Sequence, residues 1–464
     1  MSAVHAGRRG ATLIAGPLVA LLYAVVPVGG TAWAQSLEES LAKAYTTNPT
    51  LLAGQARLRA TDEGVAQALS GWRPTVSLSG EATKGQFYSN SASINRGNVR
   101  TPVTTGLSLS QNLYRGGRTV HTTNRAENLV KGERARLTTT EQDVLAAAGT
   151  AYMDVVRDQA VLDLNVNNER VLQRQLEATR DRFQVGEVTR TDVAQAESRL
   201  QRAVSDRITA EGDLIKSRAT YRNVVGDLPG TLKTAPPLSD LPASEEETVT
   251  LARDQSPTVI AARFDELAAE DQVRIVTGEL LPTVDLEGTL ERRDDSSFRG
   301  SRAEEASVTA TLRVPLYQAG AVSSRVREAK ETVSQRRKDL ERVVRTSIES
   351  ATRAWEALQT ARSQIRAFTA EVRAAEIALE GVRQEAQVGS RTVLDVLDAE
   401  QELLDGRVSL VRAKRDEVVA SFNLRAAIGT LTVDRLALNV NRYDVDSHYK
   451  SVRDKWFGTK INGQ

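Results

Sequence analysis

The sequence predicts a mainly α-helical chain that is internally duplicated and that contributes four β-strands to a transmembrane β-barrel shared by several chains. Three observations lead to this fold class. Sequence segments recur in the same order about two hundred residues apart. Four segments of about ten residues alternate between apolar and polar side chains, as strands of a membrane barrel do. Two segments of more than sixty residues contain no proline and predict very long helices.

The repeat is visible when the chain is written in two rows. Residues 73–80 (RPTVSLSG) match residues 281–288 (LPTVDLEG) at an offset of 208, and 113–117 (LYRGG) match 316–320 (LYQAG) at an offset of 203. The first copy therefore has the longer loop between these pairs. The predicted organisation is a signal peptide at 1–34, a first repeat at 35–230, a linker at 231–248, a second repeat at 249–430 and a tail at 431–464.

Residues 1–34 have the features of a secretory signal peptide. Arg8 and Arg9 precede an apolar stretch at 11–28, and the Ala-Trp-Ala sequence at 32–34 fits a cleavage site. The alternative is an N-terminal membrane anchor, which the prolines in the apolar stretch and the paired glycines directly after it disfavour. Cleavage removes two arginines and no acid, so the net charge falls from +1 to −1. Such a chain is a poor partner for nucleic acid, and without cysteine its stability must come from packing and assembly.

The strand segments show a side-chain period of two. Val76 and Leu78, for example, alternate with serines. A half-buried soluble sheet would show the same alternation. Four strands cannot cover their own apolar face, however, and a membrane barrel needs about eight or more, so several chains would share one barrel. The predicted strands are 76–83, 103–113, 284–291 and 308–314, and the predicted polar tip loops are 86–100 and 292–305.

Long helices connect the predicted strands to two tight turns. A helix at 36–70, interrupted at Pro49, precedes the first strand. Residues 120–183 and 322–387 would each span about 95 Å and return as helices at 189–226 and 392–428. Apolar residues spaced by three, four or seven predict coiled-coil packing of these hairpins. The seam residues are Leu137, Val144 and Ala151 in the first copy and Ile365, Phe368, Val372, Ala375, Leu379, Val382 and Ala386 in the second.

Enzyme chemistry finds little support in the sequence. His121 and His448 are the only histidines after the signal peptide, and there is no cysteine. Phosphate-binding, nucleophile-elbow and zinc-protease motifs are also missing from the chain. The sequence therefore predicts no catalytic residue, no cofactor and no metal site.

The turn between each pair of long helices carries the most distinctive residues. Gly186 and Gly389 suit the left-handed backbone that closes a helix, and Thr191 and Thr392 are predicted to cap the returning helices. Two further residues, Asp395 and Asp398, are three apart and share one helix face. Arranged around an axis, they would form stacked carboxylate rings that favour cations. The alternative is that both are ordinary acids at a helix N-terminus.

At these residues the chain resembles the TolC family of outer-membrane channel proteins. The resemblance covers essentially the whole mature chain and is carried by the duplicated units, by LYRGG at 113–117 and by VGSRT at 388–392 followed by DVLD at 395–398. It implies a homotrimer in the outer membrane of a Gram-negative bacterium. The family has a shared 12-stranded barrel in the lipid, a helical tunnel through the periplasm, and an equatorial collar built from linker and tail.

The same resemblance assigns roles to the turn residues. Asp395 and Asp398 would form the aspartate rings of the periplasmic aperture. Arg391 would close the aperture through polar links to Thr191 and Asp192 on the neighbouring coil. The family's gating tyrosine falls at Ala386, which cannot form a side-chain hydrogen bond and implies a weaker latch. The tips where a periplasmic adaptor docks would be Val185, Gly186, Glu187, Val388, Gly389 and Ser390.

The function implied is an exit duct for secreted polypeptides or small toxic compounds. Its partners would be a periplasmic adaptor (membrane fusion) protein and an inner-membrane ABC or RND transporter. The tail sequences at 448–450 (HYK) and 455–458 (KWFG) resemble endings in type I secretion systems, which favours polypeptide export over multidrug efflux. The alternative is a periplasmic coiled-coil adaptor or structural spacer without a channel, although the compact β-domain typical of adaptors is not evident in the sequence.

Overall fold

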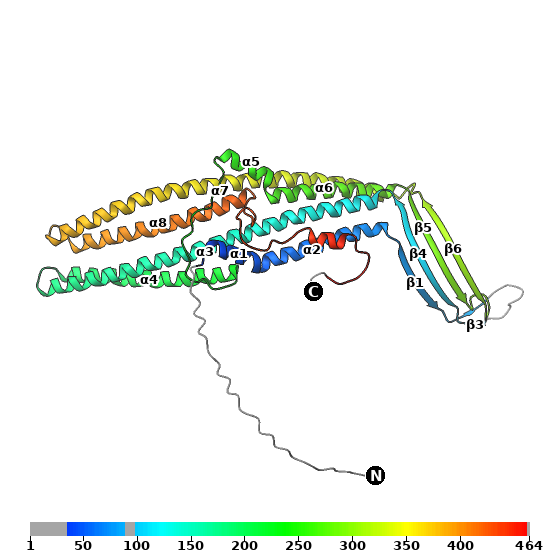
Figure 1. The fold of residues 1–464 in the computed structure, drawn as a ribbon, viewed down its shortest axis with the longest axis horizontal. Helices are drawn as coiled ribbons and strands as arrows, with labels where there is room; N and C mark the ends of the chain where they lie inside the picture. The colour runs from blue at the N-terminus through cyan, green and yellow to red at the C-terminus, as the bar shows by residue number, and fades with distance from the viewer. Residues whose placement is uncertain (1–34, 89–97, 462–464) are drawn as a thin grey trace, which may run out of the picture. The chain divides into compact units, whose positions relative to one another are not determined.

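The same order of helices and strands occurs twice in the chain (Figure 1). The computed structural model describes residues 35–88 and 98–461, so the predicted signal peptide lies outside it. The first set is α1 (Leu37–Thr47), α2 (Pro49–Leu69), β1 (Thr75–Ala82), β4 (Val103–Arg115), α3 (Arg118–Gln184) and α4 (Arg190–Val225). The second set is α5 (Glu245–Gln255), α6 (Pro257–Thr277), β5 (Thr283–Asp294), β6 (Arg302–Arg313), α7 (Ala321–Gln387) and α8 (Val393–Ala427).

Each set begins with a helix pair divided at a proline. Asn48 ends α1 and caps α2, because its side-chain oxygen accepts a hydrogen bond from the Thr50 N–H at 2.9 Å. Pro49 then occupies the first helical position, where a missing N–H costs nothing. The predicted interruption at Pro49 is confirmed, and Pro257 plays the same part at the start of α6.

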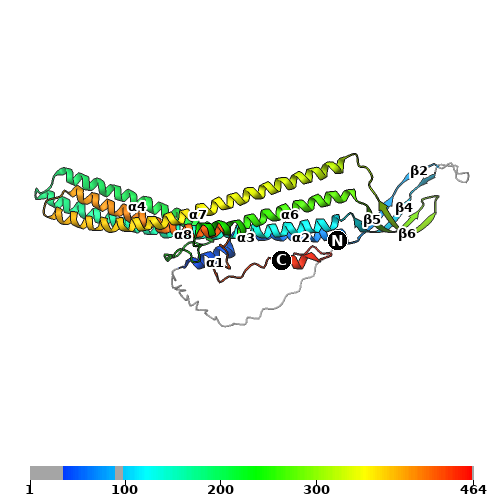
Figure 2. The same cartoon turned by 90° about the horizontal axis from the view of Figure 1, so that it is seen from above.

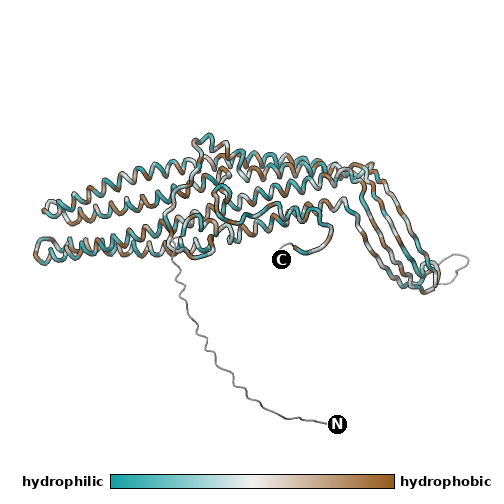
Figure 3. Tube along the Cα trace, in the orientation of Figure 1, coloured by the Kyte–Doolittle hydropathy of each residue, from teal (hydrophilic) through white to brown (hydrophobic). Residues whose placement is uncertain are grey.

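The four predicted strands form one antiparallel sheet in the order β1-β4-β5-β6. The central β4–β5 pair joins the two repeats, with Leu107 opposite Leu290. Apolar and polar residues alternate along the strands (Figure 3), and Leu78 and Val308 remain 76 % and 77 % exposed in the single chain. The sheet therefore has an apolar surface that the described part of the chain does not cover.

The loop predicted at 292–305 is shorter than expected. Pairing continues to Asp294 opposite Arg302, and Arg292 lies opposite Glu304. Opposite charges across a strand pair stabilise it, which explains why charged residues extend the hairpin rather than ending it. In the loop predicted at 86–100, the short strands β2 (Gly85–Phe87) and β3 (Asn98–Arg100) pair with each other, and 89–97 lie outside the described residues.

The two predicted helical hairpins are confirmed. Helices α3 and α7 contain 67 residues each, so each is about 100 Å long. Helix α3 packs against α4, α7 against α8, and α3 against α8, which places the two hairpins side by side (Figures 1 and 2). Across residues 35–88 and 98–461, none of the helices holds an apolar stretch long enough to cross a membrane.

The main core lies where α1, α2, α3, α4 and α8 meet. The predicted seam residues Leu137, Val144 and Ala151 are buried there beside the fully buried Phe422. Two further segments pack on the same core. One is the segment between the two repeats, and the other is the C-terminal tail, which includes α9 (Ser447–Arg453). Their contributing residues are Leu232, Ala235 and Leu238 before α5, and Leu431, Val433, Leu438, Val440 and Tyr449 in the tail. The second-copy seam is also present, since Ala375 and Leu379 pack against Leu403.

Tyr152 connects the start of the described chain to the segment between the repeats. Its side chain is fully buried, and its hydroxyl lies 2.7 Å from the Lys233 carbonyl oxygen and 3.0 Å from that of Gln35. The same hydroxyl accepts a hydrogen bond from the Lys233 N–H at 3.0 Å. Burial raises the pKa of Tyr152 to about 12.

Tyr152→Phe is expected to lower the free energy of unfolding by about 1–3 kcal/mol, because it leaves buried backbone groups without a partner. The raised pKa means that the tyrosine stabilises the fold fully below its ordinary pKa of 10 and loses this contribution as the pH rises towards 12. Thermal melting of the purified protein from neutral to alkaline pH measures both effects. Tyr317→Phe is the control because Tyr317 is 86 % exposed; equal melting temperatures for the two variants would contradict the prediction.

Candidate functional site

The turns that end α3 and α7 have the same backbone structure. Gly186 and Gly389 have φ angles of 79° and 81°, in the left-handed region that only glycine adopts without strain. The Glu187 N–H then donates to the Arg182 carbonyl at 2.9 Å, one hydrogen bond of the Schellman motif that closes a helix. The predicted role of both glycines is confirmed.

Each returning helix starts with a reciprocal capping box. Thr392 caps α8 as predicted: its hydroxyl accepts from the Asp395 N–H at 3.2 Å, and its own N–H donates to Asp395 Oδ2 at 2.9 Å. In α4 the cap is Thr189, paired in the same way with Asp192. The prediction that Thr191 caps α4 was wrong, because Thr189 has the extended backbone of a cap and Thr191 already lies inside the first turn.

Asp395 is held in its ionised form by this box. Hydrogen bonds from the Thr392 N–H and hydroxyl, together with the nearby charge of Arg391, lower the pKa of the Asp395 carboxyl. The residue therefore completes the capping box of Thr392 and also carries a negative charge at the start of α8. This structural role is the alternative that the sequence left open, and it is compatible with a carboxylate ring in an assembly.

Asp398 forms a contact that the sequence does not indicate. Its Oδ1 lies 2.5 Å from a guanidinium nitrogen of Arg199, which is on α4 of the other hairpin. Asp395 and Asp398 do lie one turn apart on α8, but their partners come from different parts of the chain. No sequence signal identifies Arg199, because 199 positions separate it from Asp398.

Arg391 pairs with Glu385 within the second hairpin, with Nε 2.9 Å from Oε2. Within the described part of one chain, no ion pair joins Arg391 to Asp192. The predicted links from Arg391 to Thr191 and Asp192 on the neighbouring coil stay a prediction.

The predicted docking tips are accessible. Val185 and Val388 are 72 % and 80 % exposed at the two turns, and Gly186, Gly389 and Ser390 are exposed beside them. Glu187 is exposed and pairs with Arg182 of the same hairpin. Two large apolar side chains open to solvent at adjacent turns are consistent with a protein-binding surface, and their docking role stays a prediction.

The two hairpins also contact each other near these turns through apolar side chains. Val393 and Leu397 of α8 are buried against Leu172 and Leu176 of α3, with Ala196 and Ala203 of α4 in the same cluster. Helix α8 therefore begins against the first hairpin as well as against its own partner α7.

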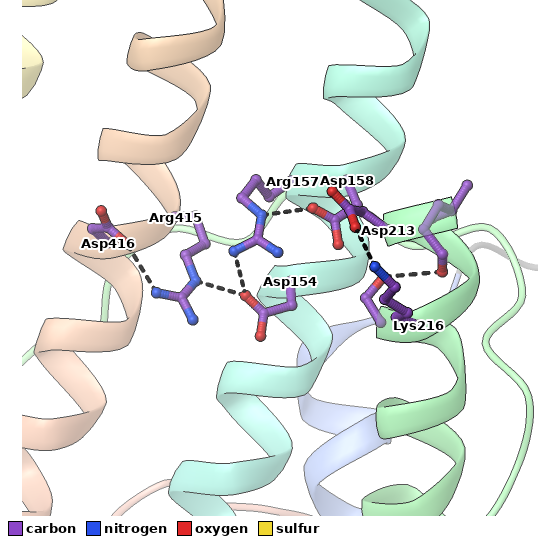
Figure 4. A network of polar contacts seen from close by, with 9 residues as sticks. Asp154, Arg157, Asp158, Asp213, Lys216, Arg415 and Asp416 are labelled. Carbon is purple, nitrogen blue, oxygen red and sulfur yellow. Dashed lines mark hydrogen bonds and ion pairs between the residues drawn. The ribbon is translucent and has the colours of Figure 1, made fainter. Parts of the chain in front are cut away.

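A second polar connection lies further along the hairpins (Figure 4). Oδ1 of Asp154 on α3 accepts hydrogen bonds from Arg157 of the same helix and from Arg415 of α8, both at 2.8 Å. The Arg415 side chain also reaches Asp416 at 2.8 Å.

Among the described residues, no three His, Cys, Asp or Glu side chains are grouped closely enough to hold a metal ion.

Comparisons with known proteins agree with this arrangement. The model of the outer membrane efflux protein family matches residues 41–227 and 248–430. The outer membrane efflux protein BepC of Brucella suis is 36 % identical over 444 residues, which cover 95 % of each chain. The outer membrane protein TolC of Vibrio cholerae is 27 % identical and aligns over 86 % of this chain and 92 % of its own.

A solved structure shows the same fold. The Campylobacter jejuni CmeC outer membrane channel superimposes with a TM-score of 0.77 at 16 % identity, over 90 % of this chain and 89 % of that one. This chain thus has a TolC-like fold, with a four-stranded antiparallel sheet continued by long helical hairpins. The protein described here is a member of the outer membrane efflux protein family, located in the outer membrane and built as a TolC-like channel protein.

Proposed function

We propose that the protein is the outer-membrane exit duct of a tripartite export system. The observation that carries the proposal is the uncovered apolar sheet surface joined directly to two long helical hairpins. Lipid can cover the apolar side chains, such as Leu78 and Val308, and the hairpins can continue the duct away from the membrane. The chain would act as wall and gate rather than as an enzyme.

The assembly we propose is a homotrimer. Strands β1 and β6 are the two edges of the four-stranded sheet, and each has an unpaired side in the part of the single chain that the structure describes. Three copies joined edge to edge would make the 12-stranded barrel that the resemblance implies, and would remove the open edges. The helical hairpins of three chains would then surround a common axis.

The narrowest point of this duct would lie at the turns. Asp395 and Asp398 would form its carboxylate rings, and Val185, Val388 and their neighbours would receive the periplasmic adaptor. The energy for export would come from an inner-membrane ABC or RND transporter. This division of labour is consistent with a turn region that holds charged and exposed apolar residues in the same place.

Type I protein secretion is the export route we favour. The tail residues that suggested it contact the first repeat: His448 lies 3.1 Å from Asp62, and Trp456 stacks on the Arg73 guanidinium. Drug efflux is the second candidate, since BepC is named as an efflux protein. Deleting the gene and measuring both secreted polypeptides and sensitivity to toxic compounds separates the two routes.

The direct test of the duct is single-channel recording of the detergent-extracted protein in a planar lipid bilayer. Small, cation-selective conductance steps are expected, together with fractionation in the outer membrane and heat-modifiable migration on gels. A folded trimer that neither inserts nor conducts would favour the alternative function, a periplasmic coiled-coil adaptor or spacer.

Arg391→Ser is expected to raise the single-channel conductance severalfold, because it would remove a polar link that holds the aperture closed. Planar-bilayer recording measures the change. Arg353→Ser is the matched control, since Arg353 pairs with Glu349 within one helix and lies far along α7 from the turn. A variant that conducts like the parent would show that Arg391 does not hold the gate.

A further inference from the structure

We propose that Arg199 and Asp398 form an intrachain latch that fastens the two helical hairpins together at the aperture. The inference rests on the proposed channel function. Arg199 is on α4, Asp398 is on α8, and their charged groups approach to 2.5 Å.

This ion pair differs from its neighbours in what it connects. Arg391–Glu385 and Arg407–Glu376 stay within the second hairpin. In the part of the chain that the structure describes, the ion pairs between the two hairpins are Arg199–Asp398 and Arg415–Asp154. Asp398 and Arg415 are seventeen residues apart on α8, so about 25 Å of helix separates the two connections. The Arg199 pair is the one at the turns.

Apolar packing couples the ion pair to the position of α8. Leu397, the neighbour of Asp398, is 2 % exposed and packs with Val393 against the first hairpin. On the other side, Ala196 lies one turn before Arg199 and is 1 % exposed in the same cluster. Moving the start of α8 away from α4 would therefore break the ion pair and expose Leu397 in the same step.

The latch also affects the charge of the proposed ring. Arg199 places a positive charge against Asp398 while the hairpins are together, which weakens the field of that carboxylate. Separation of the hairpins would release the carboxylate, so the open aperture would attract cations more strongly than the closed one.

One exposed ion pair shifts an equilibrium only about two- to fivefold, and the side chains of Arg199 and Asp398 are 29 % and 55 % exposed. Three identical pairs in a trimer act on the same opening step. Together they can shift it by up to about 100-fold.

The first test compares Arg199→Ala with Arg202→Ala by single-channel recording at about 0.1 M salt, where charges closer together than about 10 Å still interact. Arg202 is the matched control because it pairs with Asp206 within α4. Arg199→Ala is expected to raise conductance or open probability severalfold, with Arg202→Ala like the parent. The exchanged pair, Arg199→Asp with Asp398→Arg, is expected to restore closure. An Arg199→Ala variant that matches Arg202→Ala would overturn the latch.

The second test uses the absence of cysteine from the chain. Arg199→Cys with Asp398→Cys is treated with a short bis-thiosulfonate, which loses a sulfinate at each end and joins the two cysteines through two reducible disulfides, because an arginine–aspartate pair spans more than a single disulfide does. Crosslinking within single chains, with conductance that rises on reduction, is expected. Crosslinked dimers or trimers on denaturing gels would show that the contact lies between chains and would overturn the intrachain assignment. A parent protein that never conducts would instead overturn the proposed function, even if the intrachain crosslink forms.

Discussion

Replacing Phe422 by alanine is expected to lower the free energy of unfolding by about 3–5 kcal/mol. Phe422 is fully buried in the main core, where α8 meets α3. Its ring fits there because position 149 on α3 is glycine: a Cβ at Gly149 would lie 2.8 Å from the ring. Removing the ring would open a cavity at the place where the two hairpins are packed together.

Thermal melting of the detergent-solubilised protein, followed by circular dichroism, measures this loss. Phe457→Ala is the control because Phe457 is 90 % exposed. Gly149→Ala alone should also destabilise the protein. Overpacking costs about 1–3 kcal/mol, and the better helix propensity of alanine offsets about 1 kcal/mol of that loss. In the Phe422→Ala background the same change should be neutral or stabilising, because the clash has gone. Additive effects would contradict the contact.

Asp395→Asn combined with Asp398→Asn is expected to remove most of the cation selectivity of the channel. Rings of one charge raise the local counter-ion concentration by about tenfold or more, so the loss should also weaken block by multivalent cations by about tenfold. Because hydrogen bonds from Thr392 lower the pKa of Asp395, its carboxylate stays charged as the pH falls through the ordinary range of a carboxyl group. The selectivity that it supplies should be lost only at still lower pH.

Reversal potentials across a salt gradient, recorded over a range of pH, test this prediction. Asp206→Asn is the control, since Asp206 pairs with Arg202 along α4. Reversal potentials that do not change in the double variant would exclude these two residues as the aperture rings. A change in conductance without a change in selectivity would assign them to capping and latching instead.

Local sequence patterns predicted most of the elements because each depends on neighbours in the chain. The period of two in the strands, the long proline-free helices, the interruption at Pro49 and the left-handed turns at Gly186 and Gly389 all appear as expected. Two local features were not predicted: the shortened loop at 292–305 and the cap at Thr189. Charged cross-strand pairing and the choice between two nearby threonines depend on the backbone geometry as well as on residue type.

The sequence by itself determined the duplication, the element types, the turn geometry and the carboxylates at the start of α8. Only the tertiary structure decided which elements meet: β4 with β5 between the repeats, Phe422 against Gly149, and Arg199 with Asp398 between the hairpins. The physical reason is that these contacts join residues far apart in the chain. No local periodicity encodes them, because they arise when two separately formed units bury their apolar faces against each other.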